Sequence, residues 1–318
     1  MAPPAYRVIY NWDGAPHGDG APPQSMERFL EATFAPLKET HVDALFFSCG
    51  GHTAQYPSEV LPLVRDRSGR LYESVGAMIG GENVLQMIER GEDYQAAMIE
   101  RGHELGIDVF ASFRVNDNHF DGALTPQDAA AQDDMTPMRL EHPEWTLGTE
   151  TAPWFATSWN MSVPEVREHI YEAVVELCER ADWDGLEMDW QRHAFHLPSD
   201  PPPPQPSSSL SPPPLSRPLM VLRAGRQDKA HTLRAYLTDL QRAVRLATQR
   251  IAAQRGRPFL LAVRVSASLQ ACANTGYDVE QWLDEGLCDI LIPGGQRLPP
   301  MFEASTLGGL PSLFLRPG

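Results

Sequence analysis

The sequence lacks the features that mark membrane-spanning and secreted proteins. No apolar run approaches the roughly 18 residues that a membrane-spanning helix needs. The amino terminus has neither the basic segment nor the apolar core of a secretory signal. The four cysteines are scattered, show no metal-binding spacing, and are too few for a disulfide framework in 318 residues. We therefore expect a cytoplasmic protein with free thiols and no membrane partner, secreted only if its amino terminus is misassigned.

Positive charge is also scarce. The chain has 26 Lys and Arg residues against 42 Asp and Glu residues, a formal net charge of −16. Such a surface repels a phosphate backbone, so nucleic acid is not an expected partner. A content of 42% hydrophobic and 21% charged residues is typical of a globular protein rather than a disordered one. The sequence leaves the oligomeric state open.

Short apolar runs alternate with helical patterns along the chain. Six runs are rich in Val, Ile, Leu and Phe and are bounded by Gly, Asn or Asp, which predicts buried parallel strands. The turn after the first run lacks the glycines of a phosphate-binding turn, so a barrel is favoured over an open nucleotide-binding sheet. The predicted strands are Arg7–Asn11, Ala44–Cys49, Val109–Asn116, Gly185–Trp190, Leu260–Ser266 and Asp289–Gly294.

Several helices have recognisable ends. The segment Ser162-Val-Pro-Glu165 predicts a capping box with proline in the first turn. Asp278 is expected to open a short helix that Gly286 closes. Apolar residues at helical spacing, from Leu233 to Ile251, predict one face of the longest helix.

A (β/α)8 TIM-type barrel has eight strands, whereas six precede Gly295, so we expect an apparently incomplete barrel of about six strand–helix units. Residues 1–318 are interpreted as one barrel domain with two irregular segments. The segment Pro198–Pro218 holds ten prolines and six serines and is expected to be a disordered insertion. The tail Arg297–Gly318 shows no convincing strand–helix pair. Because a six-stranded sheet exposes two edges, poor solubility or self-association is expected. Little or no hydrolytic activity is expected, because a carboxylate from a seventh strand is not available.

The most informative strand carries Glu187 and Asp189. They are two residues apart, so both side chains should face the barrel axis, roughly 6–7 Å apart by strand rise. Leu186, Met188 and Trp190 should face the helices. Arg114 and Arg264 lie at comparable levels on neighbouring strands and are candidate ion-pair partners, so a purely structural ion-pair layer is one interpretation.

Three segments carry a family resemblance. They are Cys49-Gly-Gly-His-Thr, Phe113-Arg-Val-Asn-Asp and Gly185-Leu-Glu-Met-Asp-Trp-Gln-Arg. Together they resemble the bacterial family 10-like glycosyl hydrolase TIM barrels, from about Arg7 to Gly295 without the Pro/Ser-rich insertion. The fourth strand is also similar to the chitinase pattern Asp-Gly-x-Asp-x-Asp-x-Glu, but Gln191 stands where that family keeps its acid. Glutamine cannot donate a proton to a leaving group, which argues against a chitinase-type mechanism.

The resemblance implies a carbohydrate ligand, hydrolysis of a glycosidic bond and no cofactor. Glycosidases need a proton donor and a second carboxylate, and Glu187 is the candidate acid/base with Asp189 as its partner or stabiliser. Related barrels take the second carboxylate from a seventh strand that is not evident here, which leaves Asp13 and Asp117 as fallback candidates. Candidate sugar-binding residues at the strand ends are Asn11, Trp12, Asp13, His52, Tyr56, Arg114, Asn116, Asp117, His119, Arg192, His193 and Arg264.

Two alternatives remain open. A catalytically inactive carbohydrate-binding pseudoenzyme, or a truncated gene product, would keep the sugar site without a full catalytic pair. A metal-dependent barrel hydrolase would use histidines and carboxylates at the strand ends as ligands. The candidate ligands for that alternative are His52, Asp117, His119, Glu187, Asp189, His193 and His196.

Overall fold

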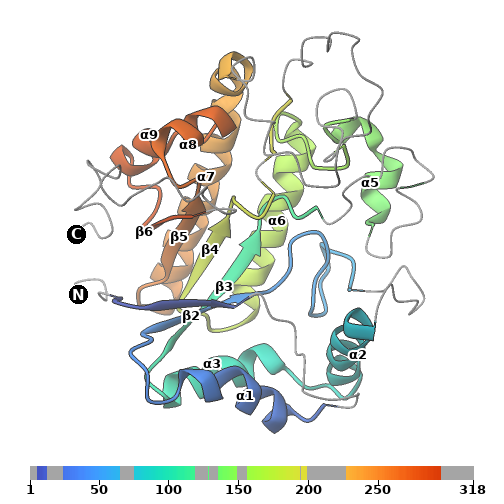
Figure 1. The fold of residues 1–318 in the computed structure, drawn as a ribbon, viewed down its shortest axis with the longest axis vertical. Coiled ribbons are helices and arrows are strands. Elements are labelled where there is room, and N and C mark those ends of the chain that lie inside the picture. Colours follow the sequence, from blue (N-terminus) through green and yellow to red (C-terminus); the bar gives the residue numbers. More distant parts are fainter. Residues whose placement is uncertain are drawn as a thin grey trace, which may run out of the picture.

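The computed structural model describes residues 6–12, 24–64, 75–118, 128, 135–148, 156–193, 195–198 and 227–294. Within these ranges, six parallel strands form one curled sheet in chain order, an incomplete (β/α)8-type barrel (Figure 1). The predicted fold class is therefore confirmed. The strands are β1 (Ile9–Trp12), β2 (Ala44–Ser48), β3 (Asp108–Arg114), β4 (Gly185–Asp189), β5 (Leu260–Val265) and β6 (Ile290–Pro293).

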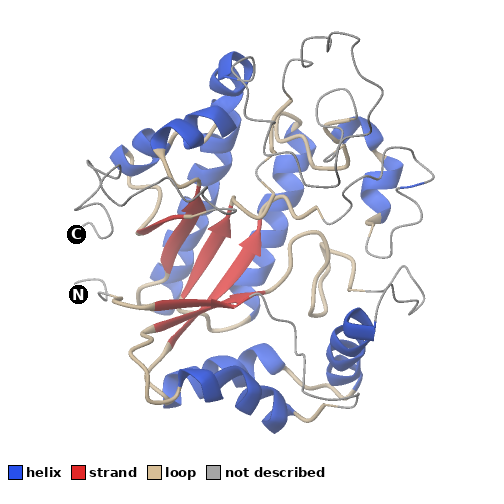
Figure 2. Cartoon of the chain, in the orientation of Figure 1, coloured by secondary structure: helices blue, strands red, loops and turns tan. Residues whose placement is uncertain are grey.

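The helices lie along the outer side of the curled sheet, as Figure 2 shows. None of the described helices is long and apolar enough to cross a membrane. They are α1 (Met26–Phe34), α2 (Val75–Glu89), α3 (Tyr94–Glu104), α5 (Pro137–Glu141), α6 (Pro164–Arg180), α7 (Gln227–Arg255), α8 (Leu269–Thr275) and α9 (Val279–Asp284), with 3-10 turns η1 (Ala35–Leu37) and η2 (Pro143–Trp145).

The two faces of the sheet pack against different partners. Leu186 and Met188 belong to the large core that the helices cover, whereas a smaller apolar cluster that includes Phe46 and Phe110 fills the inner face. Gly185 makes this inner packing possible, because a Cβ at that position would lie 2.3 Å from the Phe110 ring. The alternation predicted for the fourth strand is thus observed.

All six predicted strands are present, with ends that differ by up to two residues. The predicted capping box is wrong. The helix α6 begins at Pro164, and its N-cap is Val163, which makes no side-chain cap bond. The hydroxyl of Ser162 donates instead to Oδ1 of Asn160 at 2.6 Å, because that acceptor lies within the same turn. The short helix α9 follows Asp278 and ends before Gly286, as predicted.

Some sequence-based predictions fall outside the described residues. They concern Asp13, His119, all of the Pro/Ser-rich segment after Pro198, and the tail 297–318. In the described part of the sheet, β1 and β6 each pair with one strand only. Self-association through these edges, and the interpretation of the chain as one domain, stay predictions.

Candidate active site at the strand ends

Glu187 lies at the centre of a polar group on the inner face of the sheet. Its Oε2 accepts hydrogen bonds from Nδ2 of Asn11 at 2.8 Å and from Oγ of Ser112. Its Oε1 is 3.0 Å from Nε and 2.7 Å from Nη2 of Arg264. The Glu187 side chain is fully buried, so four donors enclose a carboxylate that solvent does not reach. We call Asn11, Ser112, Glu187, Asp189 and Arg264 the carboxylate cluster.

Asp189 lies one step closer to the carboxyl end of β4. Its Oδ1 accepts a hydrogen bond from the backbone N–H of Gln191 at 3.0 Å, and its Oδ2 is 3.6 Å from Nη1 of Arg264. The side chain of Asp189 is 6% exposed and that of Arg264 is 23% exposed. The predicted pairing of Arg264 with the two carboxylates is therefore present, and Asp189 is the carboxylate nearer the surface.

Burial raises the pKa of Glu187 above its ordinary value. The charge of Arg264 acts against this rise, the charge of Asp189 adds to it, and the hydrogen bonds from Ser112 and Arg264 lower the pKa. Desolvation disfavours the charged form of a carboxylate, and this is the largest of the opposing effects. The pKa of Glu187 is therefore raised, because no solvent reaches its side chain.

A second polar group follows the ends of β2, β3 and β4. Oδ2 of Asp117 is 3.2 Å from Nδ1 of His52 and 3.3 Å from Nη1 of Arg114, and Oδ1 is 3.3 Å from Nδ1 of His193. The loops approach closely because Gly51 has no side chain: a Cβ there would lie 2.5 Å from the carbonyl oxygen of Arg114. We call His52, Asp117 and His193 the histidine cluster.

The loop after β3 is attached to the segment 156–160 by two asparagines. Asn116 donates to the carbonyl oxygens of Trp159 at 3.0 Å and Phe195 at 2.7 Å, and accepts from the Trp159 N–H at 2.9 Å. Asn118 donates to Oγ of Ser158 at 2.7 Å. The amide of Asn116, predicted to bind sugar, is therefore engaged in holding loops together.

Two predicted aromatic contacts lie on the helix side of the sheet. The ring of Trp12 stacks on Phe29 with 6.4 Å between ring centroids. Tyr56 is 1% exposed, and the guanidinium of Arg180 lies 4.8 Å from the centre of its ring. Both aromatics therefore lie apart from the carboxylate cluster. Arg192 follows β4 and is half-buried.

Sequence reasoning missed two contributors to the site. Ser112 bonds directly to Glu187, and the signal was available, because Ser112 is two residues before Arg114 and so shares its face of β3. Tyr277 was also missed. Its hydroxyl contacts Nε2 of His196 at 2.8 Å and donates to the carbonyl oxygen of Trp190 at 2.5 Å. This bonding fixes the chain just beyond Asp189.

Among the described residues, the candidate metal ligands fall into separate groups, and only His52, Asp117 and His193 contact one another. Glu187 and Asp189 are paired with Arg264, whereas His196 is buried against Tyr277. In the part of the chain that the structure describes, no three His, Cys, Asp or Glu side chains are placed to hold a metal ion.

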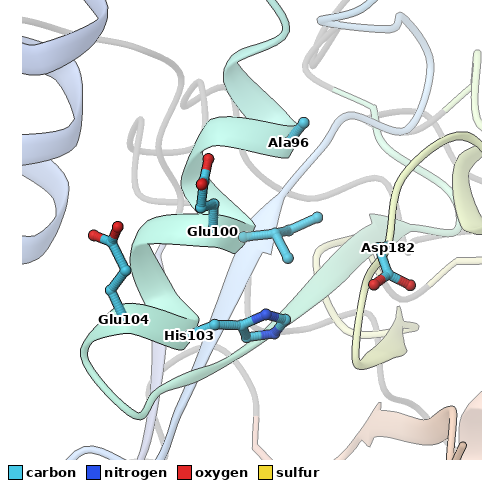
Figure 3. A pocket seen from close by; sticks show the side chains of 6 residues that line it. Ala96, Glu100, His103, Glu104 and Asp182 are labelled. Atoms are coloured by element: carbon cyan, nitrogen blue, oxygen red, sulfur yellow. The ribbon is translucent and has the colours of Figure 1, made fainter.

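A hollow lies at the opposite end of the sheet (Figure 3). Glu100, His103 and Glu104 of α3 line it together with Asp182, which precedes β4. Nε2 of His103 is 2.8 Å from Oδ2 of Asp184. Barrel active sites lie at the carboxyl ends of the strands, and residues at the amino ends serve stability, so this hollow is not the candidate site.

Comparison with known proteins supports the sequence resemblance. Residues 53–199 match the family Glycosyl hydrolase-like 10. The match confirms the predicted resemblance over this part of the chain, which contains β3, β4, Asp117 and His193. Asn11, His52 and Arg264 lie outside it. A comparison with curated proteins finds no match.

Several solved structures are similar to the chain at low identity. The PgaB (BpsB) glycoside hydrolase domain from Bordetella bronchiseptica is 13% identical over 91% of this chain and 73% of its own, with a TM-score of 0.49. A glycoside hydrolase family 18 N-acetylglucosaminidase from Paenibacillus barengoltzii is 12% identical over 90% of this chain, with a TM-score of 0.37. A family GH18 chitinase from Chromobacterium violaceum is 14% identical over 90% of this chain, with a TM-score of 0.40. This chain spans 52% and 35% of the length of the last two.

Proposed function

We propose that this protein is a glycoside hydrolase-like protein that acts on a carbohydrate at the carboxyl ends of its strands. The observation that carries the proposal is the placement of Glu187 and Asp189 side by side on the inner face of β4, both in contact with Arg264. The match of residues 53–199 to Glycosyl hydrolase-like 10 supports the same chemistry. Hydrolysis needs one group that protonates the leaving oxygen and a second carboxylate that acts as nucleophile or base.

The two carboxylates suit different roles. Asp189 is nearer the strand end, and its side chain is 6% exposed whereas that of Glu187 is fully buried, so we assign Asp189 the contact with the sugar. Burial raises the pKa of Glu187, which is the direction that a proton donor needs. We therefore keep Glu187 as the candidate acid/base and Asp189 as its partner.

The enclosure of Glu187 favours a second candidate function, carbohydrate binding without turnover. All of its hydrogen bonds are donated to it, from Asn11, Ser112 and Arg264. Such bonding suits an ionised carboxylate that holds Arg264 in place rather than an acid that releases a proton.

Turnover of a panel of umbelliferyl glycosides separates the two candidates. The panel contains α- and β-linked glucose, galactose and N-acetylglucosamine, and the proteins are the full chain, E187Q and D189N. If Glu187 donates the proton, E187Q reduces turnover by about 10²–10⁴. The control is E179Q. Glu179, on α6, is an exposed ion-pair partner of Arg250, so this variant should leave the rate unchanged.

Each remaining outcome has a defined meaning. Equal rates for E187Q and the parent would remove Glu187 from the acid role. Absence of turnover together with saturable binding of methyl glycosides that D189N abolishes would establish the binding protein. Loss of parent activity on addition of a chelator would assign the reaction to a metal ion. The absence of both turnover and binding would overturn the carbohydrate proposal.

A further inference from the structure

Tyr277 is a buried residue between the helices α8 and α9, and its hydroxyl reaches the end of β4. Gly276 ends α8 with a φ of 90°, and the N–H of Tyr277 donates back to the carbonyl oxygen of Cys272 at 2.9 Å. This bonding is that of a Schellman cap, in which a glycine takes the left-handed conformation just after a helix. The Tyr277 ring lies 6.0 Å from the ring of Trp190 and 6.1 Å from that of Trp282, between centroids. The helix end and the two indole rings therefore hold Tyr277 against the residues that follow β4.

One peptide group connects Tyr277 to Asp189. The hydroxyl of Tyr277 donates to the carbonyl oxygen of Trp190 at 2.5 Å. The N–H of the same peptide group belongs to Gln191 and donates to Oδ1 of Asp189 at 3.0 Å. Because a peptide group is planar and conjugated, its carbonyl oxygen and its N–H move together. A hydrogen bond at one end of the group therefore constrains the bond at the other end.

The carbonyl oxygen of Trp190 has a second buried partner. Nε2 of His196 lies 3.0 Å from this oxygen and 2.8 Å from the hydroxyl oxygen of Tyr277. A carbonyl oxygen can only accept, so Nε2 carries the ring hydrogen when it bonds there. Nδ2 of Asn116, which can only donate, lies 3.4 Å from the other ring nitrogen and fits the same form of the ring. The oxygen thus faces two buried donors, the Tyr277 hydroxyl and the His196 ring.

The chain of hydrogen bonds ends at a carboxylate. Burial raises the pKa of Tyr277 well above its ordinary value, and the charge of Asp189 adds to the rise, so the phenol keeps its hydrogen. Successive hydrogen bonds polarise one another in a poorly solvated interior, and a bond to a carboxylate is stronger than one between neutral groups. Donors at the Trp190 carbonyl therefore strengthen the bond from the Gln191 N–H to Asp189.

We infer that Tyr277 is a positioning residue for Asp189, which acts through the peptide group between Trp190 and Gln191. Its hydroxyl holds the peptide group whose N–H fixes Oδ1 of Asp189, and so it fixes the direction of the carboxylate that we assign to the sugar. The value of this direction for turnover or binding rests on the proposed function, whereas the chain of hydrogen bonds does not. Tyr277 lies outside residues 53–199, so the family match does not assign it a role.

This peptide group can be observed by itself, because Trp190–Gln191 is the single Trp-Gln step in the sequence. In the full chain with ¹³C at the tryptophan carbonyls and ¹⁵N in glutamine, a carbonyl–nitrogen correlation spectrum contains the peak of this group alone. Y277F removes the hydroxyl and keeps the ring, so the Trp190 carbonyl carbon and the Gln191 amide proton should both move upfield. The Gln191 amide should also exchange with solvent up to about tenfold faster, since its hydrogen bond is weaker.

Y94F is the matched control. Tyr94, on α3, is also buried and donates to a backbone carbonyl, that of Gln55, at 2.8 Å, but it belongs to the core under the helices. Y94F should leave the Trp190–Gln191 peak in place. An unmoved peak in Y277F, or equal movement in the two variants, would overturn the inference. If Y277F fails to fold, the parent decides, because a peak at random-coil positions in place of downfield ones would also overturn it.

A double-mutant cycle measures whether the hydroxyl acts on Asp189 itself. In urea denaturation, Y277F and D189N should together change the unfolding constant about threefold less than the product of their single effects, because both interrupt one chain of hydrogen bonds. The effects of Y94F and D189N should multiply. Simple multiplication for Y277F and D189N as well would give Tyr277 a merely structural role and overturn the inference.

The glycoside panel separates this inference from the proposed function. On a glycoside that the parent hydrolyses, Y277F should lower kcat about tenfold and keep KM within about twofold, because a misdirected carboxylate affects the transition state most. On a methyl glycoside that is bound without turnover, Y277F should weaken binding about threefold. Y94F should leave all three quantities unchanged. Parental kcat and binding in Y277F would overturn the positioning role. If the peak moves as expected and no glycoside is hydrolysed or bound, the proposed function fails and the chain of hydrogen bonds stands.

Discussion

Nη2 of Arg264 on β5 lies 2.7 Å from Oε1 of Glu187 on β4, and the same guanidinium lies 3.6 Å from Asp189. One cation thus serves two carboxylates, of which one is completely buried. Removing a single partner from a buried ion pair is costly, because the remaining charge stays in a poorly solvated place.

The substitution R264M should therefore destabilise the protein by about 3 kcal/mol in the free energy of unfolding, measured by urea denaturation. R250M is the matched control, because Arg250 and Glu179 are both about half exposed, and it should cost less than about 0.5 kcal/mol. Adding E187Q to R264M should recover part of the loss, because the buried charge is then removed. Equal effects of R264M and R250M would show that the carboxylate cluster does not depend on Arg264.

His196 should make stability depend on pH. Burial lowers its pKa to about 4, below the ordinary value of about 6.5. The unfolded chain therefore binds a proton at a higher pH than the folded protein does. The share of the unfolding free energy that depends on neutral His196 is fully present above about pH 6.5 and is lost as the pH falls towards 4. The loss is at most about 3 kcal/mol. Over this window the parent should lose more stability than H196Q, in urea denaturation at successive pH values.

The titration of Glu187 changes the stability of the protein with pH in the opposite direction. Its raised pKa means that the folded protein takes up a proton more readily than the unfolded chain, so acidification favours the folded state through this group. Both proteins contain Glu187, so its effect cancels in the difference between the two curves. Parallel curves for the parent and H196Q would contradict the role assigned to His196.

Gly51 should be intolerant of any side chain. A Cβ at this position would lie 2.5 Å from the Arg114 carbonyl oxygen and 2.8 Å from Cβ of Asp117. We expect G51A to cost about 1–3 kcal/mol in unfolding free energy and to shift the NMR signals of His52. G294A is the control, since nothing lies within 4 Å of a Cβ there, and it should change stability by less than about 0.5 kcal/mol. A G51A protein as stable as G294A would mean that the two loops do not pack as described.

The Pro/Ser-rich segment gives a further prediction. Its composition can neither bury apolar area nor supply ladder donors, so Pro198–Pro218 should contribute little to stability. Replacing it with a short Gly/Ser linker should change the melting temperature by no more than about two degrees. A large fall in the melting temperature would show that the segment is an integral part of the folded protein.

The strands and the orientation of Glu187 could be predicted because both depend on local pattern. A strand alternates its faces, so the buried run around Leu186 determines where Glu187 and Asp189 point. The same rule places Trp12 on the opposite face from Asn11, where its ring packs against Phe29. The histidine cluster could not be predicted in the same way. Its contacts depend on how loops from three strands approach one another, which no short-range pattern encodes.

The two asparagines after β3 have a consequence for how this edge of the protein opens. Asn116 holds Trp159 and Phe195, and Asn118 holds Ser158. Because the segment 156–160 is bonded to the same loop that carries Asp117, separation of either part breaks hydrogen bonds of the other. Backbone amides in both parts should therefore exchange with solvent at a common rate, as one cooperative unit, instead of fraying independently.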